Sequence, residues 1–401
     1  MEFWGYERPD GTVGVRNYLA VFGAGSIGHH MAVQIAREVK GAVPILMDEA
    51  LLRLKEDRDR ARLAAVGILR NPNLGAVLMI GLGGGHMDPD GLAQEIADTR
   101  KPVEVATVVG CKGYSQTMDK GLKAARRFMA EISKVQRSPV PMGKLSLGVK
   151  CGGSAGNSGL LGNVVVGRVV DQLVAAGGST IFSETPEVIG AEHLLAKRAA
   201  NDQVARRVLD VVGRMEKKIS SAGEDIRGSQ PTGGNIKNGL TTLEEKSLGA
   251  LAKTGTGPLA GVLEYAERPA GRGLFFMDGP AGPVSIMVGE AAAGAQVFIY
   301  SLGGGVYSSF RNLPGWGIGG MPLGPTISVV SNASVPRDDQ EEEFFDIHCQ
   351  GVIDGRESIG QVVDRFLQEL LAVASGKASK TEISLPQYWM PLESYHTGPM
   401  L

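Results

Sequence analysis

The sequence lacks any uninterrupted apolar run that approaches the roughly 20 residues needed to cross a bilayer. Its first residues, Met-Glu-Phe-Trp-Gly-Tyr-Glu-Arg, also lack the charged and then apolar pattern of a signal peptide. Only three cysteines occur, Cys111, Cys151 and Cys349, and an odd number in a long chain argues against a disulfide framework. We therefore expect a cytoplasmic protein that spans no membrane, with thiols that are buried or ligating.

An excess of charge is missing as well. The formal net charge is −2, which leaves no basic field to attract nucleic acid or an anionic membrane surface. Aromatic residues make up only 5% of the chain, which disfavours a stacking platform for bases or sugars. A small molecule is therefore the expected binding partner, and nucleic acid and membrane are not.

Glycine, in contrast, is abundant. It accounts for 57 of 401 residues, roughly twice the usual share of about 7%. The glycines are not periodic and cluster directly after β-rich runs, where a chain turns sharply or its backbone approaches a ligand. This placement indicates functional turns rather than collagen or disorder.

Short β-branched runs alternate with glycine-rich turns and helix-like stretches, a pattern typical of parallel strands joined by helical crossovers. We predict an α/β fold with two Rossmann-like domains and mainly parallel sheets. The length also favours two domains. The expected strands are Tyr18–Phe22, Ala76–Ile80, Val103–Val109, Leu145–Lys150, Thr180–Ser183, Gly273–Met277, Gln296–Ser301 and Thr326–Val330. The expected helices run from Gly28 to about Val39 and over Ser115–Glu131, Asn163–Ala176, Glu192–Lys217 and Ile359–Ser375.

The segment Gly23-Ala-Gly-Ser-Ile-Gly28 fits the G-x-G-x-x-G pattern between a predicted strand and a predicted helix. It is compatible with a dinucleotide site, for which Asp48 would supply the acidic residue about 20 positions further on. A lone pattern of this kind is weak evidence in a chain so rich in glycine, and the alternative is a turn that simply needs glycine.

A second turn, Cys151-Gly-Gly-Ser154 and the small residues after it, follows the predicted strand Leu145–Lys150. Its backbone N–H groups could hold a carboxylate, so Gly152, Gly153 and Ser154 are candidates for substrate binding. The Cys151 thiol could ligate a metal or could be a small buried hydrophobe.

Polar residues concentrate between Ser183 and His193. Glu184 closes a predicted strand and His193 follows near a helix start, which suits a divalent metal or an acid–base pair. Glu192 could instead be a plain helix-start acid. Asp278 ends another predicted strand, where active-site acids lie in α/β folds.

Farther along, residues 219–242 are polar and glycine-rich and are expected to form a loop over the site. The stretch after them, in which Thr241 and Thr242 precede two glutamates and Lys246, has the pattern of a capped helix start. That pattern alone would be structural.

Several of these segments are long, unusual and in a fixed order, and together they resemble the altronate/galactarate dehydratase family, which includes the large subunit of sulfolactate sulfo-lyase. The matching segments are Gly5–Asn17, Asn71–Gly83, Cys151–Ser154, Ser183–Glu187, Gly190–Leu195, Gly239–Thr242, Glu245–Gly249 and Asp346–Cys349.

The resemblance implies a family second domain over residues 1–137, a linker over 138–144, a C-terminal domain over 145–390 and a tail over 391–401. It implies a lyase that eliminates water or sulfite from a small 2-hydroxy acid with Fe(II) or Mn(II). The family's small N-terminal domain is absent from this sequence, so a separate small subunit and a homo- or hetero-oligomer are expected.

This sequence departs from the family's pattern at four places. Ser26-Ile27 stands where relatives have a cysteine, and Gly83-Gly84-Gly85 stands where they have Gly-Cys-Glu. Ala155 replaces an acid, and Leu302–Gly305 lacks an arginine. These losses weaken any inherited metal site, and the lost cation makes a dicarboxylate substrate less expected than a smaller or less charged one.

The leading hypothesis is thus a dehydratase-like lyase. Its predicted catalytic residues are Glu184, His193, Lys246 and Asp278, and Thr241 and Thr242 join the substrate-binding turn. The divalent metal, if retained, would be held by Cys151, Cys349, Glu184 and His193. The alternatives are a metal-free relative with a changed reaction (an isomerase or hydrolase), a non-catalytic ligand-binding subunit and a dinucleotide oxidoreductase.

Overall fold

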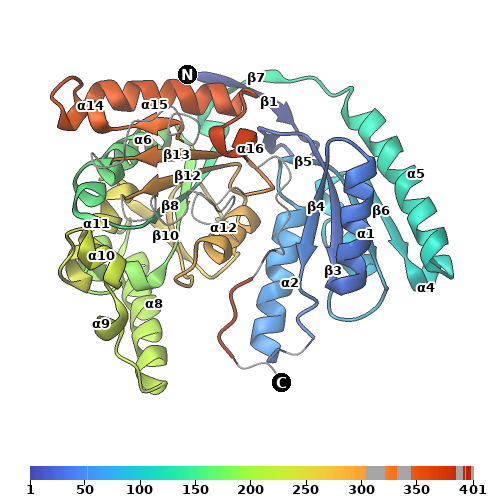
Figure 1. The fold of residues 1–401 in the computed structure, drawn as a ribbon, viewed down its shortest axis with the longest axis horizontal. Coiled ribbons are helices and arrows are strands. Elements are labelled where there is room, and N and C mark those ends of the chain that lie inside the picture. Colours follow the sequence, from blue (N-terminus) through green and yellow to red (C-terminus); the bar gives the residue numbers. More distant parts are fainter. Residues whose placement is uncertain (52, 304–320, 332–344, 385–391, 393, 399–401) are drawn as a thin grey trace.

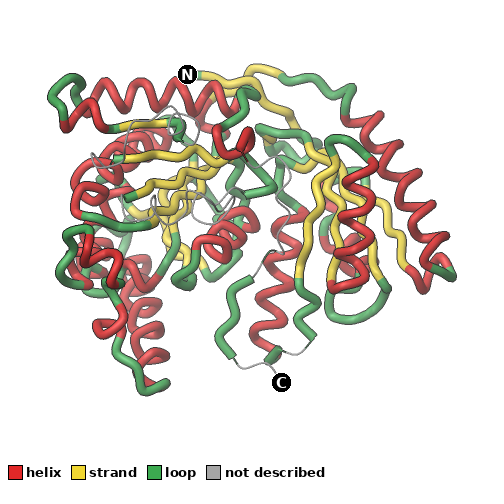
Figure 2. The backbone as a smooth tube through the Cα atoms, in the orientation of Figure 1, coloured by secondary structure: helices red, strands yellow, loops and turns green. Residues whose placement is uncertain are grey.

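The first part of the chain forms a four-stranded parallel sheet in the order β4-β3-β5-β6. The computed structural model describes all residues except 52, 304–320, 332–344, 385–391, 393 and 399–401 (Figure 1). The strands are β3 (Tyr18–Ala24), β4 (Ala42–Met47), β5 (Leu74–Gly81) and β6 (Val103–Thr107). Helices α1 (Gly25–Glu38) and α5 (Tyr114–Ile132) cover one face, and α2 (Lys55–Leu69) covers the other (Figure 2). Shorter helices are α3 (Pro89–Glu95) and α4 (Val108–Cys111).

The second part forms a seven-stranded sheet in the order β10-β11-β9-β8-β12-β13-β14, again parallel throughout. The strands are β8 (Ser146–Gly152), β9 (Ser179–Phe182), β10 (Leu259–Leu263), β11 (Gly273–Met277), β12 (Val297–Leu302), β13 (Thr326–Val330) and β14 (Ile347–His348). The predicted α/β class with mainly parallel sheets is confirmed.

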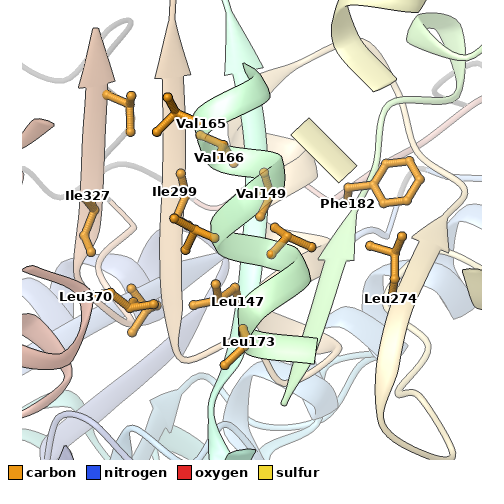
Figure 3. Close-up of a cluster of buried hydrophobic side chains, with 14 of the residues drawn as sticks. Leu147, Val149, Val165, Val166, Leu173, Phe182, Leu274, Ile299, Ile327 and Leu370 are labelled. Carbon is orange, nitrogen blue, oxygen red and sulfur yellow. The ribbon is translucent and has the colours of Figure 1, made fainter. Parts of the chain in front are cut away.

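Alternate residues of the central strands point to opposite faces, as strand geometry requires. Leu147 and Val149 of β8 face α6 (Asn163–Ala175) and pack against Val166 and Leu173 in a core that also includes α8 (Asp202–Ser221) and α15 (Ile359–Ala374) (Figure 3). The side chain of Lys150 comes from the same strand but from the set that points away from this apolar core. A charged residue can therefore end a strand that is otherwise apolar.

Helix α12 (Pro283–Ala292) covers the other face of the large sheet and packs on α2 of the first domain, so the two domains share one core (Figure 1). The contact is close because α2 carries Gly67, where an added Cβ would lie 2.5 Å from the carbonyl oxygen of Ala292. The buried Asn71 amide also donates to the carbonyl oxygens of Ala291 and Ala295, at 2.9 and 2.8 Å. Packing and buried hydrogen bonds together fix the relative position of the two sheets.

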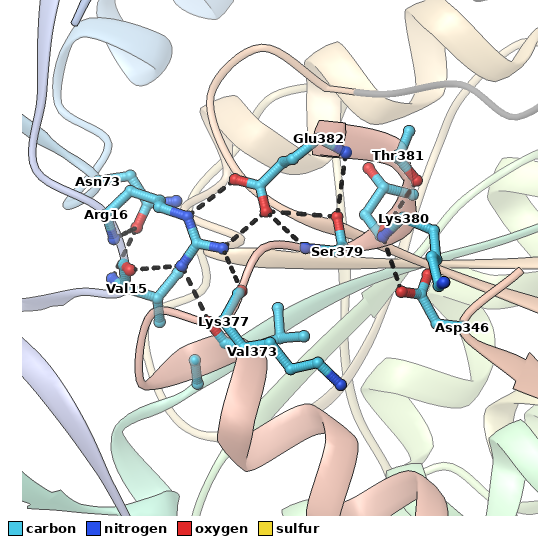
Figure 4. Close-up of polar contacts among 12 residues, drawn as sticks. Val15, Arg16, Asn73, Asp346, Val373, Lys377, Ser379, Lys380, Thr381 and Glu382 are labelled. Atoms are coloured by element: carbon cyan, nitrogen blue, oxygen red, sulfur yellow. Dashed lines mark hydrogen bonds and ion pairs between the residues drawn. The ribbon is translucent and has the colours of Figure 1, made fainter. Parts of the chain in front are cut away.

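Residues 138–144, predicted as a linker, are ordered. They form β7 (Ser138–Pro141) and a 3₁₀ turn, and β7 pairs antiparallel with β1 (Glu2–Glu7), which also pairs with β2 (Val13–Gly14). Nearby, the guanidinium of Arg16 binds the Glu382 carboxylate of α16 (Lys380–Ser384) at 2.7 Å and the carbonyl oxygen of Val373 at 2.9 Å (Figure 4). The start of the chain is thus fastened to its last helices.

The described part of the predicted polar tail packs back on the first domain. The N–H of Leu392 donates to the carbonyl oxygen of Leu46 at 2.7 Å. The buried Asp57 carboxylate of α2 accepts hydrogen bonds from the N–H groups of Thr397 and Gly398, at 2.9 and 2.7 Å. The tail therefore ties the end of the second domain to the first.

Most predicted elements appear within a residue or two of the expected bounds, but two differ. The run predicted as the strand Val103–Val109 leaves the sheet after Thr107, whose hydroxyl caps α4. The helix predicted over Glu192–Lys217 is two helices, α7 (Glu192–Lys197) and α8, because the Asn201 side chain accepts from the N–H of Val204 and starts a new helix. In both cases a helix-capping side chain, rather than the apolar pattern of the sequence, decides where the element begins or ends.

The G-x-G-x-x-G turn joins β3 to α1 as predicted, and its glycines have a packing reason. A Cβ on Gly23 would clash with the backbone of Gly28, so strand and helix lie too close for any side chain. Asp48 is held by Arg53 at 2.7 Å. Beside α1 lies a cavity of about 360 Å³ lined by Ser26, Ile27, His30, Val108 and Tyr114.

As to a membrane, none of the helices in the described residues combines the length and the apolar character that a bilayer span requires.

Candidate active site

A buried ion pair lies at the carboxyl ends of two neighbouring central strands. Lys150 is near the end of β8, and Glu184 follows β9 by two residues, so the parallel pairing of these strands brings both side chains to one edge. The Lys150 Nζ and the Glu184 Oε2 atoms form an ion pair. The two residues are only 4% and 6% exposed, so the pair is shielded from solvent and its electrostatic interaction is strong.

Glu187 is the centre of the cluster. Its carboxylate lies 3.8 Å from the Lys150 Nζ, 3.8 Å from the Lys246 Nζ and 3.3 Å from the Lys253 Nζ. The Cys151 Sγ donates to the same carboxylate at 3.3 Å. Four separate elements meet here: β8, the turn after β9, α11 (Leu243–Leu251) and the 3₁₀ turn Ala252–Thr254. We call Lys150, Glu184, Glu187, Lys246 and Lys253 the lysine–glutamate cluster.

The two carboxylates of the cluster have opposite electrostatic surroundings. Burial raises the pKa of Glu184 to about 7, with a further increase from Glu187 and a partial decrease from Lys150. Burial alone would also raise the pKa of Glu187, but Lys150 and Lys253 outweigh it and hold that pKa well below its usual value. Glu187 is therefore a fixed anion, whereas Glu184 changes protonation near neutral pH, as a proton-transfer group must.

The lysines and the thiol respond to the same charges. Burial would lower the pKa of Lys150, but Glu184 and Glu187 outweigh it and raise that pKa well above its usual value. The pKa of Lys253 is raised in the same way by its acidic neighbours, against the effect of burial. Burial and the charge of Glu187 raise the pKa of Cys151, so its thiol stays protonated. The thiol donates a hydrogen bond to the Glu187 carboxylate. Lys150 and Lys253 are therefore permanent cations.

Glu184 lies in a strained turn, and hydrogen bonds from its neighbouring residues clamp this turn to the end of β11. Its φ is +83°, a left-handed conformation that costs energy for a residue with a side chain. The next residue, Thr185, donates from its hydroxyl to Asp278 at 2.5 Å and accepts from the N–H of Gly279 at 3.1 Å. The Ser183 hydroxyl donates to the carbonyl oxygen of Met277 at 2.9 Å. The end of β11 thus holds the carboxylate of Glu184 in position.

Asp278 belongs to this clamp rather than to the cluster. Its other oxygen binds the Arg214 guanidinium of α8 at 2.8 Å, so both oxygens are occupied. In this geometry Asp278 positions Thr185 and, through it, Glu184. Its predicted catalytic role stays a prediction.

A further carboxyl group is buried on the face of β8 that carries Gly148 and Lys150. Glu290 of α12 is fully buried beside Gly148, where a Cβ would lie 2.6 Å from Glu290 Oε2. Within the described part of the chain neither oxygen makes a well-formed hydrogen bond. Burial raises the pKa of Glu290 to about 8, although Lys150 and Lys253 lower it in part. The side chain is therefore neutral at pH 7.

Replacement of Glu290 by Gln should change how stability depends on pH. The raised folded-state pKa means that the native protein binds more protons than the unfolded chain between about pH 5 and 8, so Glu290 lowers stability as pH rises. The slope approaches roughly 1.4 kcal/mol per pH unit for a single group. In urea unfolding, the stability of Glu290→Gln relative to the wild type should increase from pH 5.5 to pH 8. The relative stability of the exposed variant Glu224→Gln should stay constant. A pH-independent difference would show that Glu290 is ionised in the native state.

The turn predicted to bind substrate is covered by the segment predicted to lie over it. Gly153 has a φ of +58°, and the carbonyl oxygen of Ser154 accepts from the Asn235 amide at 3.0 Å. Residues 219–242 are not one loop but include α9 (Ile226–Ser229) and α10 (Gly233–Lys237). Gln230 from the same segment accepts from the Lys246 Nζ at 2.7 Å. The segment thus contacts both the turn and the cluster.

Thr241 and Thr242 are exposed and cap the start of α11. The Thr242 hydroxyl accepts from the N–H of Glu245 at 3.1 Å, and the Thr241 hydroxyl donates to the Glu245 carboxylate at 2.6 Å. The geometry favours the structural interpretation of this motif, and their role in substrate binding stays a prediction.

The four predicted metal ligands do not come together. Glu184 belongs to the cluster and Cys151 contacts it, but His193 is exposed on α7, and Cys349 is fully buried in the apolar core behind the large sheet. In the described part of the chain, no three His, Cys, Asp or Glu side chains are placed to hold a metal ion. The donor set that the structure assembles does not fit Fe(II) or Mn(II).

Four members of this neighbourhood were not among the predicted site residues: Lys150, Glu187, Lys253 and Glu290. Each had a sequence signal. Lys150 is a single charge at the end of an apolar strand, and Glu290 is a single charge within the apolar helix Pro283–Ala292. Lys253 closes a mainly apolar stretch after Lys246. A lone charge in an apolar segment needs a buried partner, and that rule would have pointed to these three. Glu187 was quoted within a motif but given no role.

Parallel strands that deliver a buried lysine–carboxylate cluster to their carboxyl ends define an α/β enzyme, because ligands bind at this edge of such sheets and perturbed carboxyls gather at active sites. Two family models then match almost the whole chain. The D-galactarate/altronate dehydratase C-terminal model matches residues 142–397, and the D-galactarate dehydratase/altronate hydrolase second-domain model matches residues 5–133. The chain belongs to the altronate/galactarate dehydratase family.

Curated relatives agree with this assignment. The (2R)-sulfolactate sulfo-lyase subunit beta of Chromohalobacter salexigens is 33% identical over 95% of this chain and 94% of its own length. The altronate dehydratase of Bacillus subtilis is 27% identical over 94% of this chain and 74% of its own length. The galactarate dehydratase (L-threo-forming) of Escherichia coli is 32% identical over 77% of this chain and 57% of its own length.

Proposed function

We propose that the chain is a lyase that eliminates a β-substituent from a small 2-hydroxy carboxylate, with the lysine–glutamate cluster as its active site. The observation that carries the proposal is the buried Lys150–Glu184 pair at the edge of the central strands. The lyase class is supported by family membership, since the relatives named above are dehydratases or a sulfo-lyase.

The charge of the cluster suits a carboxylate substrate. Three ammonium groups face two carboxylates in a region that solvent scarcely reaches. One positive charge is therefore in excess when both glutamates are ionised. An uncompensated buried charge is costly, and the carboxylate of a substrate would neutralise it. A single anionic group thus fits better than two.

The cluster supports the reaction as follows. The Glu184 carboxylate takes the proton from the carbon next to the substrate carboxylate. The electron pair of that C–H bond remains on the carbon as a carbanion next to the carboxylate. It then forms the new C=C bond as the C–O (or C–S) bond to the β-substituent breaks. Hydroxide leaves as water after protonation by the Lys246 ammonium, whereas sulfite needs less acid assistance. The resulting enol tautomerises to a 2-oxo acid, and no oxidant or reductant is needed.

The sulfo-lyase relative supplies a second candidate for the leaving group. The match covers nearly the full length of both sequences, and the name of this relative describes it as one subunit of an assembly. We therefore include sulfite elimination among the reactions proposed. A separate small subunit, corresponding to the additional length of the altronate dehydratase relatives, is the proposed partner.

The proposed function can be tested by product detection. Purified protein should be incubated with sulfolactate, altronate, galactarate and smaller 2,3-dihydroxy acids, with and without added Fe(II) and Mn(II). We expect a 2-oxo acid from at least one substrate, with sulfite released only from sulfolactate. The absence of any 2-oxo acid under all conditions, for a protein that still shows thermal stabilisation by one of these acids, would favour a non-catalytic binding subunit.

A further inference from the structure

The site presents a mismatch between the cation that the reaction requires and the side chains that are present. Proton removal next to a carboxylate builds a dianion, which a positive charge must stabilise. The family resemblance implies that Fe(II) or Mn(II) supplies this charge. The expected ligands Cys151, Glu184, His193 and Cys349 are, however, divided among the cluster, an exposed helix face and an apolar core.

The two of these ligands that lie in or beside the cluster, Glu184 and Cys151, are already engaged. The Cys151 Sγ donates to Glu187, and Glu184 is paired with the Lys150 ammonium. Glu187, the remaining carboxylate, has three ammonium groups within 3.8 Å. A divalent cation placed among these groups would be repelled by three fixed positive charges. The charges around Glu184 therefore favour an anion over a divalent cation.

The ammonium groups can supply the positive charge that a metal ion would otherwise supply. Lys150 comes from β8, Lys246 from α11 and Lys253 from the turn that follows α11, and their exposures are 4%, 8% and 2%. Burial and the anchor Glu187 fix their positions, so they need little rearrangement when negative charge develops. Preorganised charge of this kind is the largest single contribution to many catalysed reactions.

We propose that Lys150, Lys246 and Lys253 stabilise the carbanion next to the substrate carboxylate and that this enzyme works without a divalent cation. The inference rests on the proposed function. It adds that the charges of the site come from the chain itself, and it assigns Lys150 and Lys253 a role that the sequence motifs did not.

Two measurements test the inference on the intact protein. The first compares turnover of the best substrate before and after removal of metal with EDTA and 1,10-phenanthroline, with the metal content measured by elemental analysis. The second titrates Mn(II) into the protein by calorimetry. We expect unchanged turnover, less than one tenth of a metal ion per chain and no stoichiometric binding of Mn(II). Turnover that is lost on chelation and restored by Fe(II) or Mn(II) would overturn the inference and leave the proposed function intact.

Lysine variants complete the test. Lys246→Met should lower kcat roughly 10²-fold, as expected for the loss of one stabilising group, and should weaken thermal stabilisation by an unreactive 2-hydroxy acid. Lys246→Arg should recover part of both effects, and exposed Lys237→Met on the neighbouring α10 should change neither. A folded Lys246→Met protein with full turnover would contradict the inference. No turnover by any variant or by the wild type, with or without metal, would instead count against the proposed function.

Discussion

Glu184→Gln is expected to lower kcat about 10³-fold, since a positioned general base contributes roughly 10² to 10⁴. The amide keeps the size of the side chain but cannot accept the α-proton. In the wild type, activity should rise with pH through about 7, because burial raises the pKa of Glu184 to about 7 and only the ionised carboxylate is a base. Steady-state kinetics from pH 5.5 to 8.5 would measure both effects.

The matched control is Glu224→Gln, which changes the same group at an exposed position between α8 and α9. It should retain the kcat and the pH profile of the wild type. If Glu184→Gln were folded and fully active, with an unchanged pH profile, Glu184 could not be the base and the assignment of the site would be wrong.

Glu187→Gln is expected to destabilise the protein by about 3–5 kcal/mol, the usual cost of removing one partner from a buried ion pair. The reason is that Lys150, Lys246 and Lys253 all face this carboxylate within 3.8 Å. A neutral amide would leave their charges uncompensated in a region that water barely reaches. Urea unfolding at pH 7 would measure the loss.

A double variant separates charge from packing. Glu187→Gln combined with Lys253→Met removes one positive and one negative charge together, so it should be more stable than Glu187→Gln alone. If the single and double variants were equally unstable, the destabilisation would come from the shape of the side chain and not from the buried charges.

The fold was largely predictable because its signals are local. A β-branched run followed by glycine and an amphipathic stretch indicates a strand, a turn and a helix, and the parallel sheet follows from their alternation. The strand β7 within the predicted linker 138–144 was not foreseen, because it is recognisable only through its pairing with β1, more than 130 residues earlier. The break in the helix predicted over Glu192–Lys217 depends on the Asn201 cap, which apolar periodicity does not reveal.

The site was only partly predictable. Glu184, Cys151 and Lys246 stood in recognisable motifs, and the structure brings these three residues together around Glu187. His193 and Cys349 lie elsewhere. This could not be predicted, because sequence spacing does not tell which face of a helix or strand a side chain occupies. Lys253 stands in no recognisable motif, and its lone charge after an apolar stretch indicates only that it needs a buried partner. Its role follows from burial and from the 3.3 Å ion pair with Glu187, which only the tertiary structure defines.

The most direct test of the account is a crystal structure of Glu184→Gln with an unreacted 2-hydroxy acid bound. The account predicts that the carboxylate of the ligand lies within about 3 Å of the Nζ atom of Lys150, Lys246 or Lys253, with its α-carbon facing residue 184. A ligand bound elsewhere, for example in the cavity beside Ile27 of the first domain, with the cluster empty, would contradict it.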